Sequence, residues 1–338
     1  MPQGSNALRW QGEPGHYEVY YLTATERETG LGIWIRYTMV APAARSDEPP
    51  TCALWFSAMD PRADVHATLA RKATFTIDRM RASVDPFELR IDDALLTDER
   101  MFGALDDIEW DLRWRPAERA YEHVHPALQR LGVAKTVLVL PHADVAIDGW
   151  VTIAGRRLEL SGTPGGQAHL WGSKHAGSWV WAHCNDLRTV DGEPVPDTFI
   201  DGVSVVVPRF GRELGPNTPI VGRLHGSDFI STSPTRVIAN RSTFALTGWR
   251  FEAYDGPRKL VGEVDARRDQ LVGVTYHDPD GELAYCYNSE TSTMRLHVYE
   301  RARQVGGWRL RETFVAHGSA HFEYGQRTPV PEIELQVN

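Results

Sequence analysis

The sequence predicts a nearly all-β protein made of two antiparallel barrels. Three observations support this prediction. Alternation of apolar and polar residues dominates the chain, while helical periodicity is scarce. Turn residues recur about every ten residues, a spacing typical of β-sandwiches and up-and-down barrels. The length of 338 residues suits two domains of ordinary size.

The first half opens with a predicted hairpin, in which the turn ERETGL joins two strands rich in aromatic and β-branched residues. The segment IEWDLRW alternates cleanly, with its apolar residues on one face and its charged residues on the other, as in a half-buried antiparallel strand. The strands predicted for this half are His16–Thr23, Gly32–Val40, Thr51–Met59, Ala73–Ile77, Phe87–Ile91, Ile108–Trp114, Val145–Ile153 and Arg157–Leu160.

A glycine-rich stretch, Ser161–Gly177, contains five glycines and is interpreted as the link between the two barrels. The predicted domains are residues 1–165 and 166–338. A short helix is expected within Pro116–Leu131. The strands predicted for the second half are Ser178–Asn185, Phe199–Val207, Ile220–Leu224, Thr243–Tyr254, Leu260–Asp265, Gln270–His277, Leu283–Asn288, Met294–Arg301, Trp308–Thr313 and His321–Tyr324.

Charge and composition argue against several partners. The formal net charge of -9 disfavours binding to nucleic acid and to anionic membrane surfaces. No stretch is long and apolar enough to predict a transmembrane helix, and the first residues do not resemble a signal peptide. The three cysteines, Cys52, Cys184 and Cys286, lie far apart without paired spacing, so we expect reduced thiols and a cytoplasmic location.

The most informative window is HLWGSKHAGSWVWAHCND, residues 169–186. Period-two alternation puts Trp179, Trp181, His183 and Asn185 on one face of a strand. We expect this face to line a barrel interior, where the indoles would stack on an unsaturated ligand or stabilise a carbocation. His183 and Asn185 would supply hydrogen-bonding or proton-transfer groups, and the alternative is a tryptophan-rich strand that only fills a core.

Other chemistries lack their motifs. The chain has no C-x-x-C pair, H-E-x-x-H, G-x-S-x-G, P-loop or Rossmann fingerprint, so we predict no metal and no nucleotide cofactor. Arg36 alternates with Trp34 on the first hairpin, and a buried arginine there would anchor an anionic head group. A cross-strand ion pair is the alternative for Arg36. Asp186 is a candidate acid by its position only.

Three segments resemble a known family. They are IEWDLRWRP at residues 108–116, the hairpin DGWVTIAGRRLELSG at 148–162, and the sequence His169-Leu170-Trp171-Gly172 followed by WVWAHCN at 179–185. Together they resemble the lipocalin-like group of AttH proteins, carotenoid 1,2-hydratases and tocopherol cyclases. One departure is Ala168, which stands where many members of the group carry Asp.

The resemblance implies two lipocalin-like antiparallel β-barrels packed side by side. It also implies cofactor-free hydration, cyclisation or isomerisation of an isoprenoid, polyketide or lipid-like molecule. Two alternatives stay open: a non-catalytic lipid- or pigment-binding protein, and a scaffold whose cavity is filled by its own side chains. The candidate catalytic residues are His183, Asp186 and His169, and the candidate ligand-binding residues are Trp171, His175, Trp179, Trp181, Asn185, Trp34 and Arg36.

Overall fold

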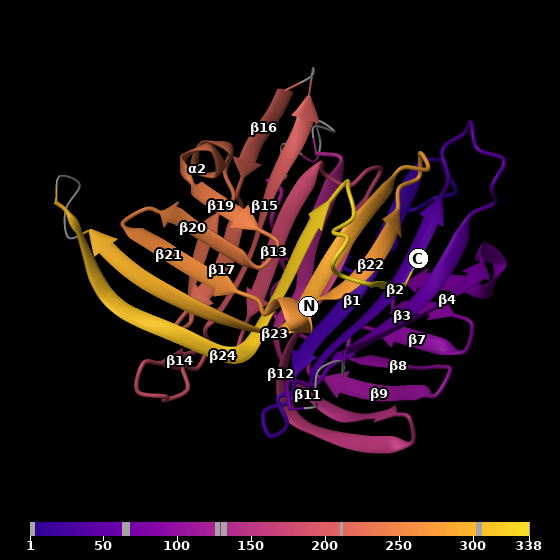
Figure 1. The fold of residues 1–338 in the computed structure, drawn as a ribbon, viewed down its shortest axis with the longest axis horizontal. Coiled ribbons are helices and arrows are strands. Elements are labelled where there is room, and N and C mark those ends of the chain that lie inside the picture. The colour runs from indigo at the N-terminus through magenta and orange to yellow at the C-terminus, as the bar shows by residue number, and fades with distance from the viewer. Residues whose placement is uncertain are drawn as a thin grey trace.

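A computed structural model describes residues 4–62, 68–125, 129, 134–209, 212–301 and 306–337 of the chain. Nearly all regular structure in these residues is β-strand, gathered in two large sheets, A and B. Figure 1 shows sheet A, from the N-terminal half, on the right and sheet B on the left. The prediction of an all-β fold with two lipocalin-like barrels side by side is confirmed.

Sheet A curls into a nearly closed barrel of antiparallel strands. Its strands, in spatial order, are β4 (Thr68–Thr76), β3 (Thr51–Met59), β2 (Gly32–Ala41), β1 (His16–Thr25), β12 (Arg156–Gly172), β11 (Thr136–Ile153), β9 (Ile108–Trp114), β8 (Arg100–Leu105), β7 (Ala94–Thr97), β6 (Phe87–Ile91) and β5 (Met80–Val84), with β10 (Tyr121–Glu122) beside β11.

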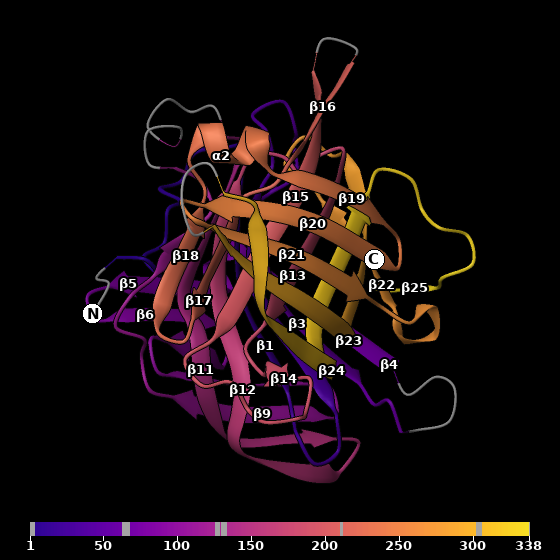
Figure 2. The same ribbon diagram turned by 90° about the vertical axis from the view of Figure 1, so that its left-hand side faces the viewer.

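Sheet B holds the C-terminal half. Its main path is β18 (Ser227–Ser231), β17 (Ile220–Leu224), β15 (Phe199–Arg209), β13 (Ser178–Cys184), β24 (Trp308–Gln326), β23 (Leu283–Arg301), β21 (Arg258–Asp265), β20 (Gly248–Asp255) and β19 (Arg241–Ala245). Off this path, β14 (Arg188–Thr189) pairs with β24, β16 (Arg212–Asn217) with β15, β22 (Val272–His277) with β23, and β25 (Leu335–Val337) runs parallel to β22. Figure 2 shows β20 and β21 crossing the front of this sheet.

Helices are few among the described residues. They are α2 (Pro234–Ala239), with proline in its first turn, and two 3-10 turns at Ile77–Arg79 and Arg268–Gln270. None of them has the length and apolarity that crossing a membrane requires. Within Pro116–Leu131 the described residues include β10 and one helical residue, Gln129; residues 126–128 and 130–131, where the rest of the expected helix would fall, lie outside the described residues.

The expected glycine-rich link is mostly strand. Residues 161–172 belong to β12, so the expected boundary between residues 165 and 166 lies inside that strand, and the chain leaves sheet A only at residues 173–177. The glycines permit close approach rather than a flexible link. A Cβ atom at Gly165 would stand 2.4 Å from the backbone oxygen of Thr23 on β1, so any larger residue would push the strands apart.

Two strands of sheet B are longer than predicted. β23 merges Leu283–Asn288 with Met294–Arg301, and β24 merges the last two predicted strands. The polar run Ser289–Ser292 suggests a turn, yet it is buried inside β23, where the pairing with β24 shifts register. A β-bulge absorbs the irregularity without ending the strand.

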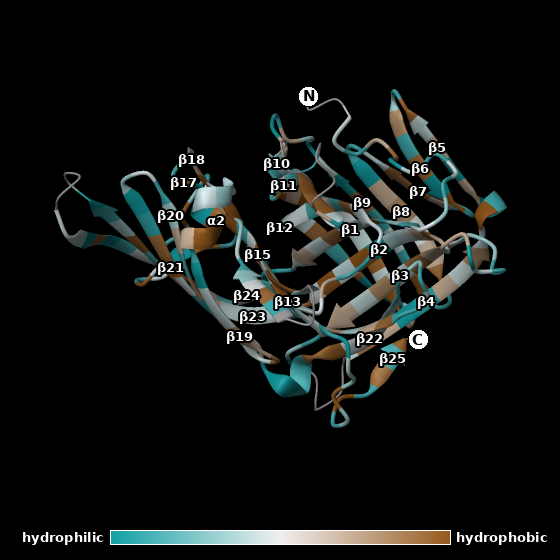
Figure 3. Cartoon of the chain, turned by 90° about the horizontal axis from the view of Figure 1, so that it is seen from above, coloured by the Kyte–Doolittle hydropathy of each residue, from teal (hydrophilic) through white to brown (hydrophobic). Residues whose placement is uncertain are grey.

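Each sheet encloses an apolar core, and two further apolar clusters lie where sheet A meets sheet B. We call this region of contact the junction. Figure 3 shows it from above, with β13, β15 and β24 of sheet B facing β1 and β12 of sheet A. On β9, Ile108, Trp110, Leu112 and Trp114 all enter the sheet A core, which confirms the predicted alternation.

Candidate active site

The aromatic face of β13 lies at the junction. Trp179 and Trp181 belong to the junction clusters, whereas Val180, Ala182 and Cys184 pack in the core of sheet B. The predicted alternation along β13 is therefore confirmed. The expectation that the tryptophans line a barrel interior is wrong, because the interior of sheet B is filled by other side chains and the tryptophans cover sheet A instead.

A buried carboxylate, Asp201 of β15, organises the polar side of the junction. It lies directly opposite His183 in the β13–β15 register. Its Oδ2 lies 3.1 Å from His183 Nδ1, its Oδ1 lies 2.8 Å from His123 Nε2, and the indole N–H of Trp181 donates to it at 3.1 Å. Burial pushes the pKa of Asp201 upward, but the contacts with His123 and His183 outweigh burial and lower it.

These contacts determine which nitrogen of His183 is free. Asp201 is ionised and can only accept, so His183 Nδ1 donates to it. In the neutral ring the other nitrogen, Nε2, then carries a lone pair, and it has no hydrogen-bond partner among the described residues. A Cβ atom at Gly166 would stand only 3.0 Å from Nε2, so glycine leaves the space in front of it open.

That space is an inner void of about 10 Å³, lined by Tyr21, Gly166, Trp181, His183 and Asp201 among others. A void of this size holds about one water molecule. His183 is therefore a buried imidazole, oriented by a carboxylate, whose Nε2 faces a space for one water-sized group. The arrangement follows the logic by which a carboxylate holds a catalytic histidine in one tautomer.

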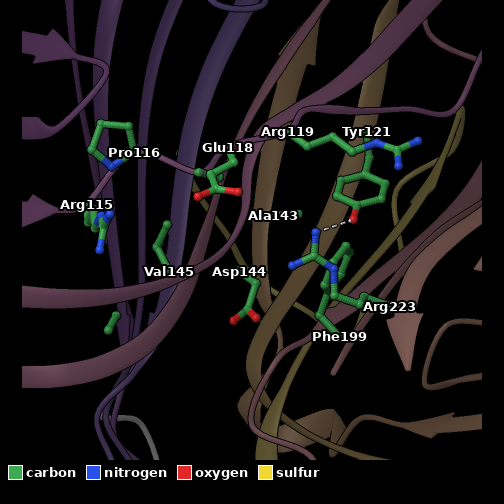
Figure 4. Close-up of a pocket in the computed structure, with 12 residues that line it drawn as sticks. Arg115, Pro116, Glu118, Arg119, Tyr121, Ala143, Asp144, Val145, Phe199 and Arg223 are labelled. Atoms are coloured by element: carbon green, nitrogen blue, oxygen red, sulfur yellow. Dashed lines mark hydrogen bonds between the residues drawn. The ribbon is translucent and has the colours of Figure 1, made fainter. Parts of the chain in front are cut away.

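A larger cavity of about 280 Å³ opens next to the inner void (Figure 4). Ala143 lines both spaces, and the ring of Phe199 lies beside His183 on one side and Tyr121 on the other. The lining comes from both sheets. The residues are Arg115, Pro116, Ala117, Glu118, Arg119, Tyr121, Ala143, Asp144, Val145, Ala146, Phe199 and Arg223.

Asp144 is one of the two carboxyl groups that line this outer cavity, with Glu118. It lies in an irregular part of β11, at the shift of the β11–β12 register between His142 and Val145. The side-chain amide of Asn185 donates to Asp144 at 2.9 Å and to the backbone oxygen of Gly165 at 2.9 Å. Burial raises the pKa of Asp144, which keeps more of it protonated near neutral pH than an exposed aspartate.

A second buried acid, Glu290 of β23, faces His321. The hydroxyl of Thr25 donates to the backbone oxygen of Glu290 at 2.8 Å, so it accepts from His321 Nε2 at 3.1 Å. Burial and the neighbouring His183 lower the pKa of His321, so its Nδ1 carries a lone pair, 3.7 Å from a Glu290 oxygen. Burial and the charge of Glu323 raise the pKa of Glu290. Both shifts favour the neutral forms of the two side chains, a carboxylic acid and an imidazole.

Arg36 lies in an aromatic cage elsewhere in the junction. Its guanidinium is 4.0 Å from the ring of Tyr276 and 5.5 Å from those of Trp34 and Trp55. Among the described residues its Nε and Nη1 atoms have no hydrogen-bond partner. Burial and the charge of Arg36 lower the pKa of Lys72 to about 8. Cation–π contacts stabilise Arg36, and no ion pair joins it to another of the residues that the structure describes.

His175 lies in the short segment that joins the sheets. Its ring stacks on those of Tyr17, Trp179 and Tyr276, at centroid distances of 4.6, 5.5 and 5.3 Å. Its Nδ1 lies 2.6 Å from a carboxylate oxygen of Asp278. With three rings and a carboxylate around it, His175 packs the connection in place.

His169 and Trp171 lie away from His183. His169 is buried on the barrel side of β12: its Nε2 lies 2.8 Å from Glu18, its Nδ1 faces the backbone oxygen of Ser5 at 2.7 Å, and its ring stacks on Tyr20. Trp171 packs under the guanidinium of Arg9, 4.9 Å from its ring. The neighbouring Ala168 points the other way and lines the inner void.

Asp186 points away from both cavities. It forms an ion pair with Arg27 at 3.0 Å and approaches Arg188 at 3.9 Å. The structure therefore brings together three of the predicted residues, Trp181, His183 and Asn185, and separates them from Asp186.

Sequence reasoning missed the residues that complete the site: Asp201, His123, His321, Glu290, Asp144 and Arg223. One signal was available for Asp201, since a lone carboxylate inside the apolar strand segment FIDGVSVVV is costly unless it is paired. His123 lies in a segment expected to be helical, where no strand pattern pointed to it. Within the described residues, no group of three His, Cys, Asp or Glu side chains is arranged to hold a metal ion.

Comparison with known proteins finds relatives along the whole chain. No protein-family model matches it. An uncharacterized protein of Mycobacterium tuberculosis, Rv0493c of strain H37Rv, is 26% identical over 336 residues, which cover 96% of this chain and 91% of that protein. Its counterpart in strain CDC 1551, MT0513, matches equally.

Two solved structures share the fold. A protein of Nitrosomonas europaea that carries the name AttH superposes with a TM-score of 0.58 at 12% identity, covering 97% of both chains. CghA with Sch210972 superposes with a TM-score of 0.54 at 11% identity, covering 92% of this chain and 88% of CghA. The similarity to AttH that the motifs implied is confirmed at the level of the fold.

Proposed function

We propose that this protein binds a small hydrophobic molecule between its two sheets and catalyses its hydration, cyclisation or isomerisation by acid–base chemistry without a cofactor. The observation that carries the proposal is the free Nε2 of His183. It faces the inner void while Asp201 holds the other nitrogen at 3.1 Å. A base fixed in this way needs no rearrangement before it accepts a proton.

In the proposed reaction Asp144 is the acid and His183 is the base. The carboxyl group of Asp144 gives its proton to one carbon of a double bond, which forms a C–H bond and leaves a cation on the other carbon. In hydration, a water molecule in the inner void forms the C–O bond and passes its proton to His183 Nε2. In isomerisation His183 removes a proton from carbon, and in cyclisation a second double bond attacks the cation first.

The surroundings suit such a cation. The rings of Tyr21, Trp181 and Phe199 lie around the two cavities, and aromatic faces attract positive charge. The apolar walls also limit the access of bulk water to it. The fold accommodates a ligand in CghA, which was crystallised with Sch210972, and we extend ligand binding to this chain as part of the proposal.

A non-catalytic binding protein is the second candidate, and one observation favours it. The void in front of His183 has a volume of only about 10 Å³, so in this conformation the bulk of a ligand stays in the outer cavity. A protein that merely holds its ligand would not need the base to reach it.

The first test is native mass spectrometry of freshly purified protein, followed by organic extraction and identification of any released compound. Compounds of that class are then assayed for turnover with the wild type, His183→Gln and Trp181→Phe. Catalysis predicts a rate loss of about 10³-fold or more in His183→Gln with binding retained. Binding without turnover supports the second candidate. No bound compound and no quenching of tryptophan fluorescence by polyenes or fatty acids would refute both.

A further inference from the structure

We infer that Arg223 forms a binding site for a carboxylate group on the molecule in the outer cavity. The inference rests on the proposed function and adds a chemical class to it: the ligand has an apolar body and one acidic group. Arg223 extends from β17 of sheet B into the cavity, and Figure 4 shows it on the wall opposite Glu118 and Val145.

The guanidinium of Arg223 is held in one orientation. Its Nη2 donates to the hydroxyl oxygen of Tyr121 at 2.9 Å, and that hydroxyl donates to Asp228 at 2.6 Å. Asp228 also pairs with Arg119. One carboxylate is therefore shared by two arginines and a tyrosine, which fixes Arg223 without neutralising it fully.

Hydrogen-bonding capacity remains on Arg223. Its Nε is buried and has no hydrogen-bond partner among the described residues, since Asp228 is 3.7 Å away. Nη2 makes the single hydrogen bond that the described residues offer this guanidinium. Leaving such donors unpaired is costly, and an incoming acceptor removes the cost.

The charge around the cavity also favours an anion. Three arginines line it, Arg115, Arg119 and Arg223, against two carboxyl groups, Glu118 and Asp144, while Asp228, outside the lining, pairs with Arg119 and lies 3.7 Å from Arg223. Burial raises the pKa of Asp144, which reduces its negative charge. A protonated Asp144 would in addition donate a hydrogen bond to a bound carboxylate.

The geometry favours a carboxylate over a phosphate. A planar guanidinium matches the two oxygens of a carboxylate, and a monoanion balances the single positive charge of Arg223. A phosphate monoester carries a larger charge near neutral pH, and Glu118 would oppose it. A cavity of about 280 Å³ accommodates a ligand of modest size.

Three probes with the same alkyl chain test the inference: octanoate, 1-octanol and octyl phosphate. Their affinities for the full chain are measured by isothermal titration calorimetry. We expect the wild type to bind octanoate at least about tenfold more tightly than 1-octanol, a difference of about 1.4 kcal/mol. Octyl phosphate should bind more weakly than octanoate, and added salt should weaken octanoate but not 1-octanol.

The variants separate Arg223 from charge in general. Arg223→Gln should bind octanoate and 1-octanol equally, and Arg223→Lys should keep part of the preference because it keeps the charge without the planar fork. Arg250→Gln is the matched control, since Arg250 pairs with Asp265 on the surface and does not line the cavity. Thermal unfolding of each variant shows whether it is folded, and Arg223→Lys serves as the test if Arg223→Gln is not.

The outcomes distinguish this inference from the proposed function. Equal binding of octanoate and 1-octanol by the wild type overturns the carboxylate site and leaves a hydrophobic pocket intact. The carboxylate site is also overturned if Arg223→Gln still prefers octanoate to 1-octanol, or if octyl phosphate binds the wild type most tightly of the three probes. Failure of all three probes to bind the wild type overturns both the site and the pocket.

Discussion

The Nδ1 atom of His183 lies 3.1 Å from the Oδ2 atom of Asp201, deep in the junction between the two sheets. The two residues stand directly opposite each other on β13 and β15, so strand pairing alone holds them in contact. The same carboxylate also engages His123 and Trp181. One aspartate thus orients the base of the proposed site and ties together two strands and a loop.

Asp201→Asn should destabilise the protein and impair turnover. Breaking a buried charged pair costs roughly 3–5 kcal/mol, and an amide that donates to His183 favours the wrong tautomer, which costs up to about 10⁴-fold in rate in enzymes with this arrangement. Urea unfolding and turnover assays measure the two effects. The exposed Asp93→Asn serves as control, and a variant with wild-type stability would contradict the role of Asp201.

The stability that Asp201 contributes to the fold should decrease on acidification. Its pKa is lowered in the folded state, so its contribution is present above the unfolded pKa, about 3.9, and is lost as pH falls through the folded pKa. The stability difference between the wild type and Asp201→Asn should therefore shrink on acidification.

Gly166→Ala tests the space in front of His183. The new methyl group would stand 3.0 Å from Nε2 and 3.2 Å from the backbone oxygen of Ala143. Stability should change by no more than about 1 kcal/mol, while turnover of the identified substrate should fall by about tenfold or more. Gly307→Ala is the control, because a Cβ atom there meets nothing within 4 Å. Unchanged turnover would show that the reaction does not use Nε2.

Glu290→Gln should stabilise the protein near neutral pH. The pKa of Glu290 is raised by burial and by Glu323, so the folded state holds a proton that the unfolded chain releases above a pKa of about 4.3. As the pH rises from the unfolded pKa towards the folded pKa of Glu290, the free energy of unfolding of the wild type falls by about 1.4 kcal/mol for each pH unit. Above the folded pKa it falls no further on account of this group. The gain should vanish well below pH 4. Unfolding curves at several pH values measure it, with exposed Glu109→Gln as control.

The connection between the sheets depends on Asp278. Its carboxylate accepts from the backbone N–H of His175 at 2.9 Å, lies 2.6 Å from His175 Nδ1, and accepts from Arg327 at 2.7 Å. Asp278→Asn should cost about 3 kcal/mol and speed hydrogen exchange in residues 173–177. Asp280→Asn, in the same loop, breaks a partly exposed ion pair with Lys174 and should cost no more than about 1 kcal/mol. Equal effects of the two variants would contradict this assignment.

The sheet content and many strand positions could be read from the sequence because side-chain alternation is local. Strands such as β9 and β13 carry a period of two, and the residues on each face were predicted correctly. The errors occurred where local pattern and tertiary environment disagree. The polar run Ser289–Ser292 has the composition of a turn but is buried within a strand. The glycines of β12 have the composition of a linker but allow neighbouring strands to pack closely.

The sequence by itself determined that Trp179, Trp181 and His183 share a face, since this follows from the geometry of a single strand. Only the tertiary structure decided what that face meets. Asp201 is 18 residues from His183 and Asp144 is 41 residues from Asn185, and each reaches its partner through strand pairing or sheet packing. Strand register and the contact between the two sheets depend on the whole chain at once. The carboxyl groups of the site, Asp201 and Asp144, therefore meet their partners only when the sheets have formed and packed together.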